Sequence, residues 1–184
     1  MHYVKRELQS LRGLLRQPRQ LAFQVLNLAM IAMSALMLWR GLIVFTGSES
    51  PIVVVLSGSM EPAFYKGDIL FLNNDPPPIE VGEIVVFKIE GKDVPIVHRI
   101  VESNFLANGT EAYLTKGDNN PMDDRQGMLY AEGQVWLQRR HMLGRAVGAL
   151  PFVGHVTILL NEYPAAKVIL VGLMGLLVIS SKEG

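Results

Sequence analysis

Hydrophobic residues gather in two runs near the ends of this 184-residue chain, and a more polar stretch separates them. The first run, residues 21–46, reads LAFQVLNLAMIAMSALMLWRGLIVFT and is almost wholly apolar. A helix that spans a membrane needs roughly 20 such residues to cross the hydrocarbon layer. We therefore predict a transmembrane helix over residues 21–40, with Trp39 and Arg40 as anchors at the membrane surface.

Two other interpretations of this run fit it less well. A cleavable signal peptide has an apolar core of only about 7–15 residues, and a buried helix of a soluble protein shows a polar face.

Residues 1–20 carry five basic side chains against one glutamate. The positive-inside rule puts this basic tail in the cytosol. The helix then acts as a signal anchor, and the rest of the chain lies in the lumen or outside the cell.

Residues 48–150 have a different pattern, in which short β-branched and aromatic runs alternate with Gly, Pro, Asn and Asp. This spacing is typical of antiparallel strands and unlike βαβ units. The expected strands read PIVVVL, DILFL, GEIVVFKIEG, VPIVHRIVE, AYLTKGD, GQVWLQ and MLGRAVGAL. We predict a mainly β fold, with one β-rich domain over residues 47–162.

The end of the chain reads as two short helices interrupted at Pro164, because proline cannot continue a helix from the preceding residue. The second segment, residues 165–181, is apolar apart from Lys167 and shorter than a usual spanning helix. We expect it to dip into the bilayer. Spanning a locally thinned membrane and packing as a core helix are the open alternatives.

Charge and composition exclude several classes of function. The formal net charge is zero, so nothing indicates a nucleic-acid partner. There is no cysteine, which excludes disulfides, thiolate catalysis and cysteine zinc sites. We expect no cofactor and no metal.

Ser57-Gly58-Ser59 ends the apolar run PIVVVL, where a serine can project from the edge of a sheet. A serine nucleophile needs a base to take its proton and donors for the oxyanion that forms. A solvated turn is the commoner use of Ser and Gly at such a place. Taken alone, the tripeptide favours the turn.

His98 lies inside the strand-like run VPIVHRIVE. Histidine is the side chain best suited to act as a base near neutral pH, although a lone histidine in a strand is more often structural. The other histidines, His2, His141 and His155, fall in a basic tail, a polar loop and a predicted helix, and are weaker candidates.

Three carboxylates follow in the segment KGDNNPMDDR, at Asp118, Asp123 and Asp124. An aspartate can orient a catalytic histidine and stabilise its imidazolium. Ordinary turn chemistry explains the same residues. A calcium loop is a third alternative, but the spacing does not match an EF-hand.

Asn108-Gly109-Thr110 is a sequon, so Asn108 is a candidate for N-glycosylation on a luminal domain.

Four segments occur in an order that resembles the type I signal peptidases: SGSMEP, GEIVVFKIEGKDVPIVHRI, LTKGDNNPMDDR and LGRAVGALPFVG. More closely, the chain is similar to the catalytic subunits of the eukaryotic endoplasmic-reticulum signal peptidase complex. The resemblance runs from about Gln24 to the C-terminus. It implies a signal-peptidase-like antiparallel β domain with an N-terminal membrane helix and a short C-terminal membrane-associated helix.

The resemblance also implies roles for individual residues. Ser59, just before Met-x-Pro, corresponds to the nucleophile, and Ser57 to an oxyanion donor. His98 stands where bacterial relatives have a lysine base, whereas Lys88 and Lys92 fall outside that position. This exchange implies a Ser-His-Asp mechanism.

The resemblance places the third member of this triad among the three aspartates. Asp124 is the preferred candidate and Asp123 the alternative, with Asp118 as a second functional acid.

The implied activity is removal of signal peptides from preproteins entering the endoplasmic reticulum, with cleavage after small residues. The implied protein is a single-pass type II membrane protein of the endoplasmic reticulum with a luminal catalytic domain. Its partners would be preproteins, the membrane and other complex subunits. The alternatives are a catalytically silent scaffold subunit and a prokaryotic plasma-membrane signal peptidase.

Overall fold

The computed structural model describes residues 18–74, 78–107 and 109–180. The first 17 residues of the predicted basic tail and the sequon residue Asn108 lie outside this part. The chain divides into one compact unit, Leu42–Pro164, and a second unit that holds the apolar segments before and after it.

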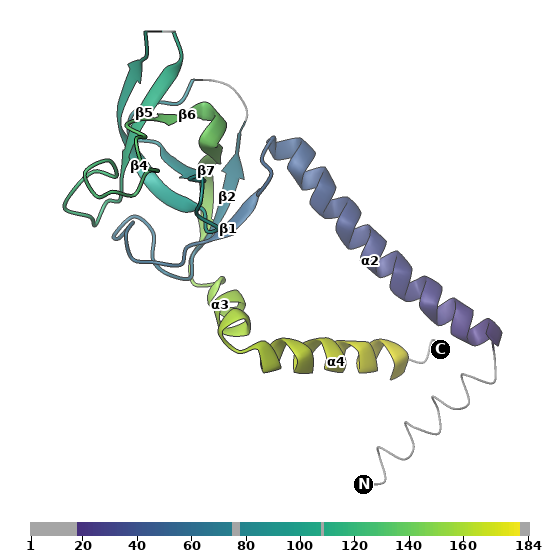
Figure 1. The fold of residues 1–184 in the computed structure, drawn as a ribbon. Helices are drawn as coiled ribbons and strands as arrows, with labels where there is room; N and C mark the ends of the chain where they lie inside the picture. Colours follow the sequence, from purple (N-terminus) through teal and green to yellow (C-terminus); the bar gives the residue numbers. More distant parts are fainter. Residues whose placement is uncertain (1–17, 75–77, 108, 181–184) are drawn as a thin grey trace. The chain divides into compact units, whose positions relative to one another are not determined.

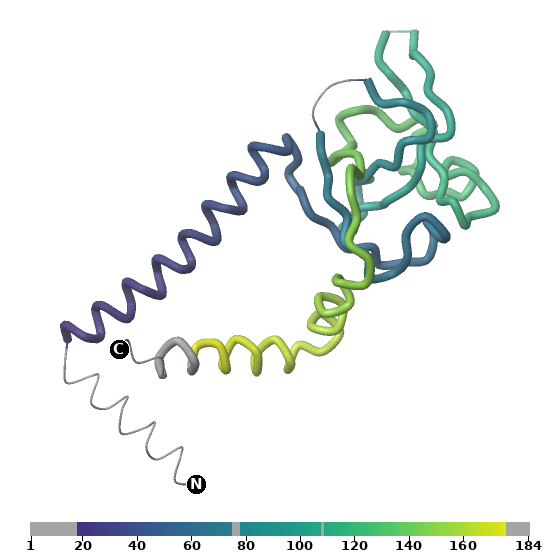
Figure 2. Tube along the Cα trace, turned by 180° about the vertical axis from the view of Figure 1, so that it is seen from behind, coloured from purple at the N-terminus to yellow at the C-terminus, as the bar shows by residue number. Residues whose placement is uncertain are grey.

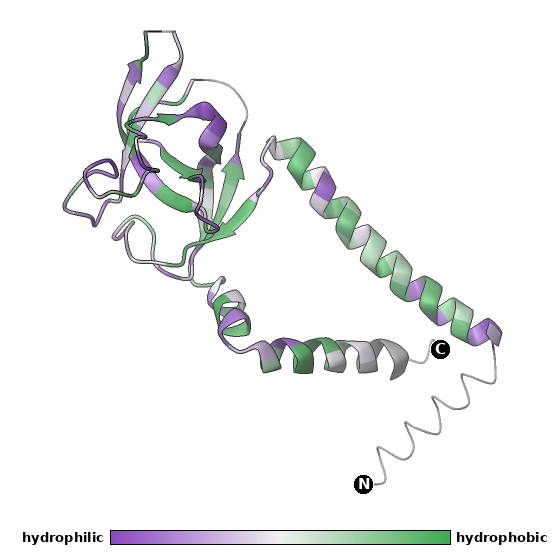
Figure 3. Ribbon diagram, viewed as in Figure 1, coloured by the Kyte–Doolittle hydropathy of each residue, from purple (hydrophilic) through white to green (hydrophobic). Residues whose placement is uncertain are grey.

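The N-terminal apolar run forms one long helix, α2 (Pro18–Thr46). Its ribbon is hydrophobic along almost its whole length (Figure 3). A proline at the first helical position costs little, because that residue has no intrahelical partner for its N–H. Among the described residues, α2 is the one helix that is long and apolar enough by itself to cross a membrane.

Seven antiparallel strands form the body of the compact unit (Figure 1). Their bounds are β1 (Ile52–Val54), β2 (Ile69–Asn73), β3 (Ile84–Phe87), β4 (Ile96–Phe105), β5 (Glu111–Lys116), β6 (Leu137–Gln138) and β7 (Met142–Leu150). A 3₁₀ helix, η1 (Arg139–His141), separates the last two strands. The predicted mainly antiparallel β fold is therefore confirmed.

One expected strand, GQVWLQ, is much shorter than its sequence suggests, because only Leu137 and Gln138 pair in the sheet. The residues before them form a turn. The side chain of Gln134 donates to the carbonyl of Trp136, and its backbone N–H donates to the carbonyl of Ala131. These local hydrogen bonds compete with strand pairing.

The strand order across the sheet is β1-β2-β7-β3-β4-β5-β6. The last strand of the chain, β7, thus lies between β2 and β3 and joins two groups of strands (Figure 1, Figure 2). It pairs with Ile69–Asn73 on one side and with Ile84–Phe87 on the other. The segment that follows β1 and the strand β4 therefore belong to different halves of the sheet.

Both faces of β3 are buried. Val85 and Phe87 belong to one hydrophobic cluster together with Ile100 and Leu137, whereas Val86 belongs to a second cluster on the other face. A strand that is apolar on consecutive positions is typical of this double burial. Its neighbour β4 is fixed by four consecutive pairs, in which Val85 lies opposite His98.

Two helices follow the sheet: α3 (His155–Glu162) and α4 (Pro164–Ser180). The predicted interruption at Pro164 is observed, since α4 begins there. These two helices pass the length and composition test for a membrane span only when His155–Glu162 and Pro164–Gly175 are counted as one broken pair.

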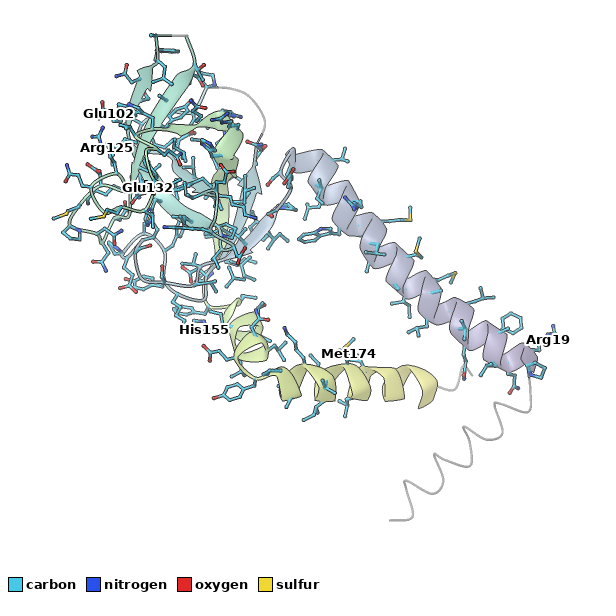
Figure 4. All side chains as sticks on the ribbon, in the orientation of Figure 1. Arg19, Glu102, Arg125, Glu132, His155 and Met174 are labelled. Carbon is cyan, nitrogen blue, oxygen red and sulfur yellow. The ribbon has the colours of Figure 1, made fainter. Side chains whose placement is uncertain are left out.

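The start of α3 is held against the sheet unit by backbone contacts. Gly154 N–H donates to the carbonyl of Gly67 (2.8 Å), and Phe152 N–H donates to the buried carboxylate of Asp68 (3.1 Å). Gly67 has a φ of 93°, and a Cβ there would lie 2.0 Å from the ring of His155, which stands at the start of α3 (Figure 4). Only glycine fits this close approach.

Candidate active site

The Ser57-Gly58-Ser59 segment leaves the end of β1 as a tight turn. Met60, directly after it, is completely buried and holds the turn against the core. A loop from the other half of the sheet holds it from the outside, because Asn119 N–H donates to the carbonyl of Ser59 (2.9 Å) and Asn119 Nδ2 donates to that of Gly58 (3.1 Å). The turn that the tripeptide alone favoured is real, and it presents Ser59.

Ser59, His98 and Asp124 form a series in which each side chain lies within hydrogen-bonding distance of the next. The Oγ of Ser59 is 3.1 Å from Nε2 of His98, and Nδ1 of His98 is 2.6 Å from Oδ2 of Asp124. His98 and Asp124 are buried, with 4% and 2% of their surface exposed. A short contact between an imidazole N–H and a buried carboxylate fixes which ring nitrogen carries the proton, so Nε2 is free to accept one from Ser59.

The other two aspartates have different partners. Asp123 Oδ1 accepts the N–H of Gln126 (2.8 Å) and closes a local turn. Asp118 receives two hydrogen bonds from Arg99, through Nε (2.9 Å) and Nη2 (2.7 Å). Of the three carboxylates, Asp124 is the one that contacts His98. The second acid proposed from the resemblance is therefore half of an ion pair beside the site.

The hydrogen bonds from Arg99 hold the pKa of Asp118 below its ordinary value, although partial burial opposes the shift. A carboxyl group whose pKa is depressed by folding stabilises the protein above its unfolded pKa of about 3.9, and this stabilisation is lost as the pH falls through the folded pKa. We expect the melting temperature of the enzyme to fall less between pH 7 and pH 3 in Asp118→Asn than in the wild type. Thermal melts at the two pH values measure this. Equal falls in both proteins would exclude Asp118 as a source of acid sensitivity.

Ser57 is exposed, and its Oγ lies 3.3 Å from the Oγ of Ser59. The two hydroxyls are thus neighbours on the same side of the turn. This position agrees with that of a donor to an oxyanion formed at Ser59.

Gly117 contributes space to the site, which the sequence analysis missed. A Cβ at this position would lie 2.8 Å from Nε2 of His98, 2.8 Å from the carbonyl oxygen of Ser59 and 2.7 Å from Nδ2 of Asn120. The signal was present in the sequence, because Gly117 precedes the Asp-Asn-Asn turn, but only the packing shows which groups it approaches.

We expect Gly117→Ala to lower kcat by at least about 100-fold, because a methyl group would clash with Nε2 of His98 and with the carbonyl oxygen of Ser59, and small displacements of reacting groups cost this much. Gly133→Ala is a control for a backbone change, since nothing lies within 4 Å of a Cβ there, although its φ of 77° makes the substitution mildly strained. The cleavage rate of the assembled enzyme measures both. Wild-type kcat in Gly117→Ala would show that the neighbours move aside.

A groove of about 1060 Å³ runs past these residues. One wall is formed by β1 and the segment after it, from Val53 to Ser57, and another by residues from Val94 to His98. Thr157 and Ile158 of α3 also line it. Among the strands that the structure describes, β1 pairs with β2 alone, so its second edge has no strand partner there. The groove therefore combines an edge strand, apolar walls and the Ser59–His98 pair.

Two further histidines lie away from this site. His141 Nδ1 accepts the N–H of Gln138 (3.1 Å), and burial lowers the pKa of its imidazole. His155 stacks on Phe152. His2 falls outside the described residues. Within the part of the chain that the structure describes, no group of three or more His, Cys, Asp or Glu side chains is placed to hold a metal ion.

A hydroxyl, an imidazole and a buried carboxylate in line on an antiparallel β unit define the class of serine peptidases. The family model described as Peptidase S24-like matches residues 23–128, more than half of the chain, and the model described as signal peptidase C-terminal short helix matches residues 156–180.

Curated relatives carry more specific names. The signal peptidase complex catalytic subunit SEC11C of Rattus norvegicus is 61% identical over 90% of this chain and 85% of its own length. The corresponding sec11 subunit of Dictyostelium discoideum is 54% identical over 89% and 90% of the two chains. That of Sclerotinia sclerotiorum is 54% identical over 92% and 98%. The chain belongs to the family of signal peptidase complex catalytic subunits.

Proposed function

We propose that this protein is the serine endopeptidase that removes N-terminal signal peptides from preproteins entering the endoplasmic reticulum. The observation that carries the proposal is the hydrogen-bonded series Ser59–His98–Asp124 beside an apolar groove. A silent scaffold subunit would not need a hydroxyl, an imidazole and a buried carboxylate in this arrangement. The relatives are named as signal peptidase complex catalytic subunits, which points to the same reaction.

In the mechanism that we propose, Ser59 Oγ attacks the scissile carbonyl carbon while its proton passes to Nε2 of His98. The oxyanion is received by the N–H of Ser59 and the hydroxyl of Ser57. The carbon–nitrogen bond then breaks, and the imidazolium gives the proton to the leaving amine. Asp124 keeps His98 oriented and stabilises its positive charge.

The signal peptide is left as an ester on Ser59. Water then attacks this ester as His98 takes its proton, and Ser59 is released with its proton restored. The same imidazole thus acts as base and as acid in both halves of the reaction. The chemistry thus uses five groups from four residues of this chain: the hydroxyl and the N–H of Ser59, the hydroxyl of Ser57, the imidazole of His98 and the carboxylate of Asp124.

We infer that the substrate binds as an extended strand along the free edge of β1. Backbone hydrogen bonds to an edge strand give affinity, and pockets beside the edge select alternate side chains. The groove is lined by valines from β1 on one side and by Pro95 and Ile96 on the other. Such walls favour the small residues that precede a signal-peptide cut.

We further propose a single-pass type II arrangement in the endoplasmic-reticulum membrane. Residues 1–20 lie in the cytosol, α2 spans the bilayer, and the sheet unit and the groove face the lumen. Five basic residues before α2 and its apolar length support this orientation. Residues 165–181 dip into the bilayer, and other complex subunits complete the enzyme. In sealed microsomes an added protease should then spare the sheet unit.

Mapped cleavage of a model preprotein by membranes that contain the assembled enzyme tests the function. We expect one cut after an A-x-A sequence, and a loss of rate of more than about tenfold when either alanine becomes tryptophan, because a pocket shaped for a methyl group rejects a large ring. A matched tryptophan at the middle position is the control. Equal cleavage of the three tryptophan-containing substrates would contradict the proposed binding mode.

A further inference from the structure

A buried pair of hydroxyls, from Thr115 and Tyr130, is hydrogen-bonded in series to the carboxylate of Asp124. Oδ2 of Asp124 accepts two hydrogen bonds at the same time, one from Nδ1 of His98 and one from Oγ1 of Thr115, both 2.6 Å long. Oγ1 of Thr115 is in turn 2.9 Å from the hydroxyl of Tyr130. Thr115 is completely buried and Tyr130 is 7% exposed.

The direction of each hydrogen bond in this group follows from counting protons. The Tyr130 oxygen accepts the backbone N–H of Thr115 (3.0 Å), and a carboxylate can only accept. The single hydroxyl proton of Thr115 therefore goes to Asp124, so the contact between the two hydroxyls is donated by Tyr130. Burial raises the pKa of Tyr130 above its ordinary value, which keeps that hydroxyl protonated as a donor.

Backbone contacts hold the same residues in place. Asp124 N–H donates to the carbonyl of Thr115 (3.0 Å), so Thr115 binds both the main chain and the side chain of Asp124. The ring of Phe87 lies edge-on to His98 and to Tyr130, with both pairs of centroids 6.4 Å apart. The imidazole, the carboxylate and the two hydroxyls thus form one packed unit.

We propose that Thr115 and Tyr130 are positioning residues that orient the Asp124 carboxylate toward His98. The proposal rests on the function assigned above and deepens it. The two donors hold Oδ2 in one orientation, facing Nδ1 of His98. A carboxylate oxygen fixed in this way keeps the imidazole proton on Nδ1. Nε2 is then free to accept the proton of Ser59.

Neither hydroxyl touches the substrate groove, because Thr115 and Tyr130 are absent from its walls. Their loss should therefore act on kcat and leave KM almost unchanged.

The first test compares Thr115→Val with Thr115→Ser in the assembled enzyme. Valine keeps the shape and removes the hydroxyl, so we expect kcat to fall about tenfold with KM almost unchanged. Serine keeps the donor and should restore most of the rate. Wild-type kcat in Thr115→Val would overturn the proposal, as would an equal loss in both variants.

The second test uses tyrosine and does not depend on the folding of the first variants. Tyr130→Phe should lower kcat about threefold and leave KM almost unchanged. Tyr113→Phe is the matched control, because Tyr113 is also buried and its hydroxyl donates to Glu111 (2.5 Å), away from Asp124. Identical kinetics in the two variants would refute the role of Tyr130. Cleavage by Ser59→Ala would instead refute the proposed function, whatever these variants show.

Discussion

Replacing His98 by alanine is expected to lower the cleavage rate by at least about 1000-fold, since the serine then has no base at hydrogen-bonding distance. Nε2 of His98 is the nitrogen that faces Ser59, at 3.1 Å. The variant should still fold, because His98 contributes one ring to a core that Phe87 and Ile100 fill. Cleavage of a preprotein by membranes with equal amounts of assembled enzyme measures the loss.

His98→Lys is the informative companion, because bacterial relatives use a lysine base. We expect it to be as inactive as His98→Ala. A lysine at this position would lie beside the buried carboxylate of Asp124, which favours the charged ammonium and removes the lone pair that a base needs. Recovered activity in His98→Lys would show that the site accepts a Ser-Lys mechanism. Retained cleavage in His98→Ala would favour the alternative that the chain is a catalytically silent scaffold subunit.

Asp124→Asn should lower kcat by about 10³- to 10⁴-fold while leaving the fold intact, as the loss of the orienting carboxylate does in other triads. An asparagine can donate to Nδ1 of His98, which places the imidazole proton on Nε2. That nitrogen then cannot accept the proton of Ser59. The side-chain volume is unchanged, so the loss reports the tautomer of His98.

The control for this prediction is Asp123→Asn, one residue earlier. Asp123 closes a turn by accepting the N–H of Gln126, and asparagine can accept the same bond. We expect its kcat within about threefold of wild type. Equal losses in the two variants would mean that the whole segment, and not the carboxylate of Asp124, determines the rate.

The strand pattern and the order of the motifs could be predicted from the sequence. Alternating runs bounded by turn residues predicted the strands, and the segment PIVVVL followed by Ser-Gly-Ser predicted an edge with a hydroxyl at its end. The sequence could not choose among Asp118, Asp123 and Asp124, because the choice depends on which loop residue folds back toward β4. Asp118 accepts hydrogen bonds from Arg99, and Asp123 accepts one from Gln126.

Thr115 and Gly117 were missed for a related reason. Each acts through a neighbour that is distant in sequence: Tyr130 for the first, and Ser59 and His98 for the second. Periodicity reports which face of a strand is buried, but not which buried hydroxyl meets which carboxylate. The length of GQVWLQ was overestimated because side-chain hydrogen bonds from Gln134 compete with pairing.

The position of β7 has a consequence for the time at which the enzyme becomes active during its synthesis. Ser59 follows β1 in one half of the sheet, whereas His98 and Asp124 belong to the other half, and β7 is the strand that pairs with both. It is also the last strand to leave the ribosome. Until Leu150 has emerged, the sheet cannot bring together the proposed nucleophile, Ser59, and the proposed base, His98. We therefore expect the protease to stay inactive until the ribosome has released the whole of β7.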